Sequence, residues 1–150
     1  DAQTGQLLSF EDTNHYAEVK GGVLPVTNDG ISPDGVEQAG WPMPFAGVGS
    51  ETTDTGGNFS SSGTVTTDFY GPYVNINDNC GSSSLSGSGV LDWGTSGGTD
   101  CTTPGFGGAG NTHASRTGFY ELNKIIEMAR EVFISGIRMV MRFRLFFIRR

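Results

Sequence analysis

The sequence is poor in large apolar residues. Leucine, isoleucine, valine and phenylalanine together make up 34 of its 150 residues, only slightly above the level of roughly 20% below which chains tend to be disordered. Long uninterrupted apolar runs are also missing, so no stretch resembles a signal peptide or a membrane span, and we expect no membrane partner. These shortages predict one folded domain with a small core and many loops.

Basic residues are scarce over most of the chain. Residues 1–130 contain four lysines and arginines against fifteen acidic residues. Because a phosphate backbone needs a basic footprint, we expect no nucleic-acid partner. Residues 131–150 reverse this balance with five arginines and a single acidic residue, Glu131.

Cysteine is nearly absent. Cys80 and Cys101 form no CxxC pair, and both His15 and His113 are distant from them in sequence, so zinc ligation has little support. The favoured interpretation is one disulfide that closes a loop of about 22 residues and contributes on the order of 3 kcal/mol. Two buried free thiols or a metal site are the alternatives. A disulfide would indicate an oxidising compartment, extracellular or periplasmic, and we expect a secreted, extracellular protein. Because the chain starts with Asp1, a signal sequence could have been lost upstream of it.

Glycine, in contrast, is abundant, at 24 of 150 residues, about twice its usual share of roughly 7%. Patterns typical of β-strands occur at residues 1–12, 15–26 and 64–79, and the glycine pair at 21–22 predicts a bulge or hairpin. Residues 27–50 carry turn signals and three prolines, which predict an extended loop, and residues 50–66 offer little to bury.

The clearest predicted element is an amphipathic helix at about 112–133. Asn111 or Thr112 can cap it by accepting a bond from a free backbone N–H. Apolar residues three and four apart form one stripe, namely Phe119, Leu122, Ile126, Ala129 and Phe133. We therefore predict an α+β fold, with short antiparallel strands, long glycine-rich loops and one helix near the C-terminus.

Residues 134–150 depart from this pattern. Ile137, Met139 and Met141 alternate with Arg138 and Arg142, as residues do in a strand. The segment is too short and too charged to span a bilayer, although it could lie on an anionic surface. Its composition also differs from everything before it, so a frameshift or misread gene end near residue 131 is the favoured interpretation. The strand and the surface segment stay as alternatives.

Two groups of side chains are candidate binding sites. Oxygen ligands of the kind that calcium accepts come from Asn75, Asn77 and Asp78, but without the spacing of an EF-hand, and a solvated turn is the alternative. Exposed aromatic residues could bind a sugar or another surface, and the candidates are Trp41, Tyr70, Tyr73 and Trp93. His113 and Ser115, two positions apart on the predicted helix, should point to different sides, which argues against a catalytic pair.

Three stretches together resemble the secreted zinc metalloproteases of the thermolysin-like and fungalysin-like group. "DAQTGQLL" (1–8) resembles the last strand-turn-strand of their propeptide, and "YVNINDNCG" (73–81) with "GTDC" (98–101) resembles the linking region of bacterial members. "GNTHASRTGFYELNKIIEMAR" (110–130) is similar to the first helix of the catalytic domain. The implied segments are a propeptide-like β end at 1–27, a Gly/Ser/Thr-rich loop and strand segment at 28–110, the first catalytic-type helix at 111–133 and the atypical arginine-rich tail at 134–150.

This resemblance implies peptide-bond hydrolysis in the full-length protein. There, two histidines one turn apart hold Zn²⁺ and a neighbouring glutamate activates the bound water. The present sequence contains no HExxH motif, so no catalytic residue or metal ligand can be assigned and we expect the chain to be inactive alone. Its expected partners are the remainder of its own catalytic domain and, in the full-length protein, a protein or peptide substrate.

Two other interpretations stay open. One is a secreted β-rich binding or adhesion module without catalysis. The other is a glycine-rich secreted chain with no independent fold.

Overall fold

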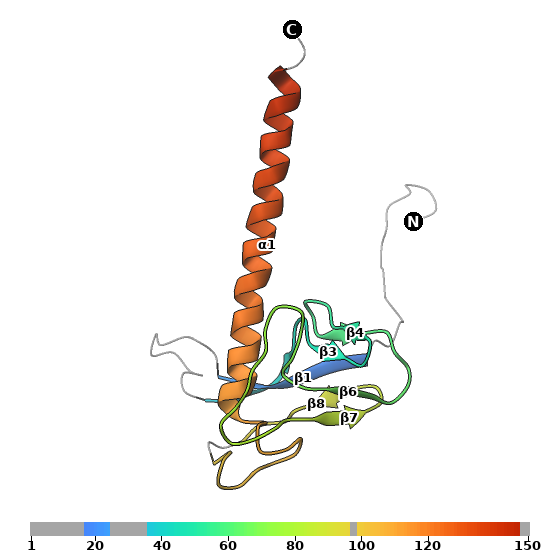
Figure 1. The fold of residues 1–150 in the computed structure, drawn as a ribbon, viewed down its shortest axis with the longest axis vertical. Coiled ribbons are helices and arrows are strands. Elements are labelled where there is room, and N and C mark those ends of the chain that lie inside the picture. Colours follow the sequence, from blue (N-terminus) through green and yellow to red (C-terminus); the bar gives the residue numbers. More distant parts are fainter. Residues whose placement is uncertain (1–16, 25–35, 97–98, 148–150) are drawn as a thin grey trace, which may run out of the picture.

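The structure is a computed structural model, and it describes residues 17–24, 36–96 and 99–147, with the side chains of the terminal helix described as far as Phe133. The predicted strand-turn-strand at 1–12 lies outside these residues. Short strands in two sheets and one long C-terminal helix make up the described chain (Figure 1). The predicted α+β class is therefore confirmed.

The first sheet is built around β1 (Ala17–Val23). β1 pairs antiparallel with β2 (Gln38–Pro42) and β5 (Asn58–Phe59), and parallel with β8 (Leu91–Asp92). Its register against β2 shifts between Gly21 and Val23, so the bulge predicted from the glycine pair is confirmed.

The second sheet has four short antiparallel strands in the order β4 (Glu51–Thr52), β3 (Gly47–Val48), β6 (Val65–Thr67) and β7 (Leu85–Gly87). The prediction of a plain loop at 27–50 is wrong for β2 and β3, because strands this short leave no readable periodicity. The prediction that 50–66 offer little to bury holds for most of the segment, whose buried residues are Thr53, Gly57 and Phe59. The buried Thr53 hydroxyl donates to Met43 O and accepts from the Ala46 N–H.

Residues 74–77 follow their predicted burial without forming the predicted strand. Val74 is buried and Ile76 half-buried, while Asn75 and Asn77 are exposed. The backbone there makes only an isolated bridge between Tyr70 and Asn75. The alternation correctly predicted which side chains turn inward, but a single bridge does not extend into a ladder.

Both sheets and helix α1 (His113–Phe147) contribute to one small core. Its aromatic centre is Trp93, whose ring lies 4.4 Å from that of Phe69, which in turn lies 5.9 Å from Phe119 of α1. Trp93 is only 2% exposed, so the prediction that it serves as a surface-binding aromatic is wrong. The motif around it alternates: Leu91 and Trp93 are buried, whereas Asp92 is exposed.

Helix α1 begins beside β1 and then rises away from the β-sheets (Figure 1). It runs on to Phe147, well past the predicted end at 133, so the interpretation of the tail as a strand is wrong. Arginine, methionine and leucine favour helix, and an existing helix extends at little cost where no proline intervenes. No helix in the described part of the chain has the uninterrupted apolar length that crossing a bilayer requires.

As far as Phe133, where the described side chains of α1 end, its apolar stripe is covered only near the start of the helix. Phe119 is fully buried and Ile126 packs against the core. Five further apolar side chains are 45–73% exposed, namely Leu122, Ile125, Met128, Val132 and Phe133. The predicted stripe is thus real as a pattern, but most of it faces away from the sheets.

Gly21 provides a test of how tightly α1 is seated. A Cβ at this position would lie 2.9 Å from Trp93 Cβ and 3.1 Å from Arg116 Cδ. We predict that Gly21→Ala lowers the free energy of unfolding by about 1–3 kcal/mol, as overpacking does. Gly63→Ala, where a Cβ meets nothing within 4 Å, is the control and should change stability by about 1 kcal/mol or less. Equal urea midpoints for the two variants would contradict this packing.

Candidate functional site

The most connected polar group of the described chain surrounds the first turn of α1. We call it the helix-start cluster, and its members are Asp78, Asp100, Asn111, Thr112, His113, Ser115 and Arg116. Several of these side chains are buried although they are polar or charged. A buried polar side chain needs hydrogen-bond partners, so the cluster can be understood from where each partner comes.

Thr112 is the N-cap of the helix. Its Oγ1 accepts a 3.0 Å bond from the backbone N–H of Ser115, which confirms the predicted cap. The hydroxyls of Thr112 and Ser115 both donate to Asp78 Oδ2, at 2.7 and 2.8 Å, while Asp78 Oδ1 accepts from the Cys80 N–H at 2.8 Å. A carboxylate at this end of a helix also complements the helix dipole.

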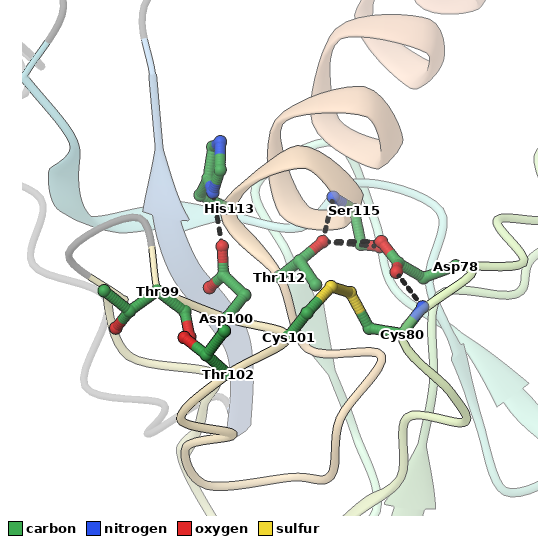
Figure 2. The surroundings of a disulfide bond; sticks show 9 residues. All are labelled: Asp78, Cys80, Thr99, Asp100, Cys101, Thr102, Thr112, His113 and Ser115. Atoms are coloured by element: carbon green, nitrogen blue, oxygen red, sulfur yellow. Dashed lines mark hydrogen bonds and ion pairs between the residues drawn. A yellow bond between two sulfur atoms is a disulfide. The ribbon is translucent and has the colours of Figure 1, made fainter.

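His113, the first helical residue, forms a hydrogen-bonded pair with Asp100. Its side chain is 37% exposed, whereas that of Asp100 is 5% exposed. Figure 2 shows His113 directed to Asp100 and Ser115 directed to Asp78. The two residues therefore bind different carboxylates, and the arrangement lacks the nucleophile–base contact that acyl-transfer chemistry needs.

The predicted disulfide between Cys80 and Cys101 is present. It joins the two segments that carry the aspartates, because Asp78 lies two residues before Cys80 and Asp100 directly before Cys101 (Figure 2). The bridge thus holds together the two loops on which the first turn of α1 rests.

Arg116 connects the cluster to the first sheet and is fully buried. Its Nε donates to Gly22 O at 3.0 Å, and its Nη2 contacts Glu37 Oε1 and Ser96 Oγ, both at 2.6 Å. Its Nη1 donates to the backbone and side-chain oxygens of Asn111 at 3.1 and 2.5 Å. Planar guanidinium donors suit such a divided set of acceptors, which one ammonium group could not reach.

The second oxygen of Glu37 closes this network. Glu37 Oε2 accepts from the backbone N–H of Ser96 at 2.8 Å. A Cβ at Gly22 would lie 2.5 Å from Glu37 Oε1, so glycine at this position leaves the room that the carboxylate occupies. Arg116 and Glu37 were absent from the sequence-based candidates because residues 79 positions apart give no pattern.

The cluster offers little to a metal ion. Among the described residues, the one group of histidine, cysteine or acidic side chains close enough to share an ion is Asp78, Cys80 and Cys101. Its two sulfurs are bonded to each other, so neither is the thiolate that a metal requires. Of the calcium candidates, Asp78 has both oxygens hydrogen-bonded, and Asn75 and Asn77 are exposed nearby. Calcium binding there stays a prediction.

The remaining aromatic candidates separate into two kinds. Trp41 packs edge-on against Tyr120 of α1, with ring centroids 5.0 Å apart. Tyr73 packs edge-on against Phe45, and Arg130 of α1 lies over both rings, so these two aromatic residues contact the helix. Tyr70, 56% exposed, has no ring partner among the described residues. Tyr70 is the most exposed of the four candidates, and Tyr73 is also 44% exposed although its ring packs on Phe45.

Replacing Arg116 tests whether its network holds the helix. We predict that Arg116→Met lowers the free energy of unfolding by about 3–5 kcal/mol, because Glu37 then lacks its buried partner. Arg116→Lys should recover only part of this loss. Arg130→Met, which removes an exposed arginine, is the control and should cost about 1 kcal/mol or less. Chemical denaturation of the three variants measures the difference, and equal losses at 116 and 130 would contradict the assignment.

The pKa values of Asp78 and Asp100 predict acid sensitivity. Burial raises the pKa of each carboxyl, but hydrogen bonds outweigh it and the net pKa is lowered, by Thr112, Cys80 and Ser115 for Asp78 and by Ser96 and His113 for Asp100. Their contribution is complete above the unfolded-state pKa of about 4 and is lost as the pH falls through the lower folded-state values.

We therefore expect the free energy of unfolding to fall steeply below about pH 4. Asp78→Asn should be less stable at neutral pH and show a shallower acid decline. Urea denaturation between about pH 2 and pH 7 measures both slopes. A wild-type chain that keeps its full stability throughout the acid range would contradict the role given to these carboxylates.

No protein-family model, curated protein or solved structure matches this chain. The geometry of the helix-start cluster and of the surrounding surface therefore carries the functional interpretation.

Proposed function

We propose that this chain is the propeptide end and the first part of the catalytic domain of a secreted zinc endopeptidase, and that it is inactive alone. In this proposal the β-sheets and the disulfide-tied loops are the segment that leads into the catalytic domain. Helix α1 is the first helix of that domain, and the zinc-binding helix follows it in the full-length protein.

The observation that carries this proposal is the uncovered apolar stripe of α1. Leu122, Ile125, Met128 and Val132 lie three or four residues apart, Phe133 directly follows Val132, and all five are about half exposed or more. A helix with one apolar stripe normally packs that stripe against another layer of its own domain. The described sheets cover only the first turns, so the remainder of the catalytic domain is the partner that fits the rest.

The chemistry of the helix-start cluster supports a scaffolding role. The hydroxyls of Thr112 and Ser115 are bonded to Asp78, and the guanidinium of Arg116 is bonded to Gly22 and Glu37 on the first sheet and its flanking segment. His113, its imidazole member, is paired with Asp100. The cluster therefore fixes the position at which α1 leaves the sheets, which is what the first helix of a larger domain needs.

Secretion is part of the same proposal. The disulfide is compatible with an oxidising compartment, where such bonds persist. In a reducing cytosol the two loops beneath α1 would lose their covalent link.

A second candidate function is a secreted binding or adhesion module without catalysis. The exposure of Tyr70 favours it, because an aromatic ring left free on a fixed backbone is a common recognition element. This candidate predicts that the chain folds stably without further sequence, whereas the endopeptidase proposal predicts that it aggregates through α1.

The gene decides between the two. We predict that reading it from codon 105 onward in all three forward frames uncovers an HExxH motif followed by a downstream glutamate. The protein expressed from the continuous frame should cleave casein, lose activity in a zinc chelator and regain it with Zn²⁺. The present chain, assayed in parallel, should show no cleavage.

A confirmed frame with a stop codon after Arg150 and no such motif nearby would refute the endopeptidase proposal. A sharp, reversible thermal transition of the purified chain at high concentration would point the same way. Either result would leave the binding module as the better candidate.

A further inference from the structure

Tyr70 lies on a part of the surface that the endopeptidase proposal does not use. Its side chain follows β6 and is exposed, while the neighbouring Phe69 is buried in the core. An exposed tyrosine presents both an apolar ring and a hydroxyl group to a ligand, so the surroundings of this ring decide whether it can contribute to a site.

The backbone at Tyr70 is held on both sides. Tyr70 O accepts from the Gly47 N–H at 2.7 Å, and the Gly71 N–H donates to Val74 O at 2.9 Å. A Cβ on Gly71 would lie 2.0 Å from Phe45 O, so the next residue passes in direct contact with a neighbouring loop. The ring of Tyr70 is therefore presented from a fixed position.

Two hollows share Tyr70 as a lining residue. One, of about 460 Å³, lies over the β3–β4 hairpin and β6, and the other, of about 370 Å³, lies over residues 75–78 and 81–83. Both are lined by Asp68 and Tyr70. Volumes of roughly 300–1,000 Å³ accommodate small ligands, and two hollows that share one wall can hold an extended ligand across it.

Some polar side chains of these hollows are already hydrogen-bonded, such as Glu51 to Ser60 and Asp78 to Thr112, but three are not. In the described part of the chain no hydrogen bond is made by the Asp68 carboxylate or by the side chains of Asn75 and Asn77. By contrast, the carboxylates of the other described aspartates accept hydrogen bonds, and these are Asp54, Asp78, Asp92 and Asp100. A carboxylate accepts hydrogen bonds from ligand hydroxyls, and a carboxamide can both accept from them and donate to them.

The charge of the surface narrows the class of ligand. Residues 1–130 carry fifteen acidic residues against four basic ones, and Glu51 and Asp68 line the larger hollow. Such a field repels an anionic ligand such as a uronic acid or a phosphate. An uncharged ligand rich in hydroxyl groups, with an apolar C–H face for the tyrosine ring, matches both the polar walls and the sign of the charge.

We propose that the two hollows form a binding site for a neutral oligosaccharide, with Tyr70 as the platform between two sugar rings and Asp68, Asn75 and Asn77 as partners for sugar hydroxyls. The site is independent of the endopeptidase proposal, because Tyr70, Asp68, Asn75 and Asn77 belong neither to the helix-start cluster nor to the exposed stripe of α1. Asp78, a member of the cluster, lines the smaller hollow beside them.

The test is isothermal titration of the full chain with neutral hexasaccharides of glucose (β1,4- and α1,4-linked), xylose and N-acetylglucosamine. At least one should bind. Tyr70→Ala should weaken that binding about tenfold or more, as expected for loss of an aromatic contact. Tyr70→Phe should retain it, and Asp68→Asn should weaken it severalfold. The matched control is Phe106→Ala, which removes another exposed aromatic and should leave binding unchanged.

Three outcomes would overturn the proposal. None of the hexasaccharides binds the wild-type chain, or Tyr70→Ala binds as tightly as Phe106→Ala, or calcium titrates into the site at Asp68 and saccharide binding is absent. Circular dichroism of each variant, compared with the wild-type spectrum, separates lost binding from lost folding. If Tyr70→Ala does not fold, Asp68→Asn, which keeps the size of the side chain, is the second test, and unchanged saccharide binding by that variant would also overturn the proposal.

Discussion

The guanidinium of Arg116 joins segments that lie far apart in the sequence, and the position of α1 depends on it. Gly22 on β1, Glu37 before β2, Ser96 after β8 and Asn111 before the helix all meet at this one side chain. A buried charge is tolerated only when its partners are complete, so each of these segments must be in place together. Glycine is required at positions 21 and 22 of β1 for a second reason besides the bulge, because side chains at these positions would collide with Arg116 and Glu37.

The hydrogen-bond network around Arg116 compensates for the small size of the apolar core. Among the described side chains, twelve buried apolar residues form the core, and Phe119 is the one that α1 contributes. Hydrogen bonds and the disulfide therefore take over part of the positioning that larger domains obtain from packed apolar layers. The direction in which α1 leaves the sheets is well defined as a result, while its apolar stripe stays available for a further layer of structure.

Several features could be predicted from the sequence because their causes are local. The cap at Thr112 follows from residue type next to an apolar stripe, the bulge from Gly21–Gly22, and the disulfide from two cysteines without a metal pattern. The roles of Arg116, Glu37 and Trp93 could not be predicted, because each depends on partners brought near by the fold. Trp93 lies in a glycine-rich loop that suggests exposure, yet β8 pairs with β1 and carries the ring into the core.

The contacts at Arg116 also affect how the chain reaches its fold. The bonds to Gly22 and Glu37 span 94 and 79 residues, and contacts of such separation form slowly because long loops must close first. A helix of this kind forms locally within about a microsecond. During folding α1 therefore forms before the sheets and loops that hold its first turns, and in that period Phe119 and the apolar stripe are both exposed to solvent. Until the four segments that contact Arg116 have come together, the apolar stripe of α1 can bind neighbouring chains. Dilution or a helix-binding chaperone should therefore raise the yield of native protein.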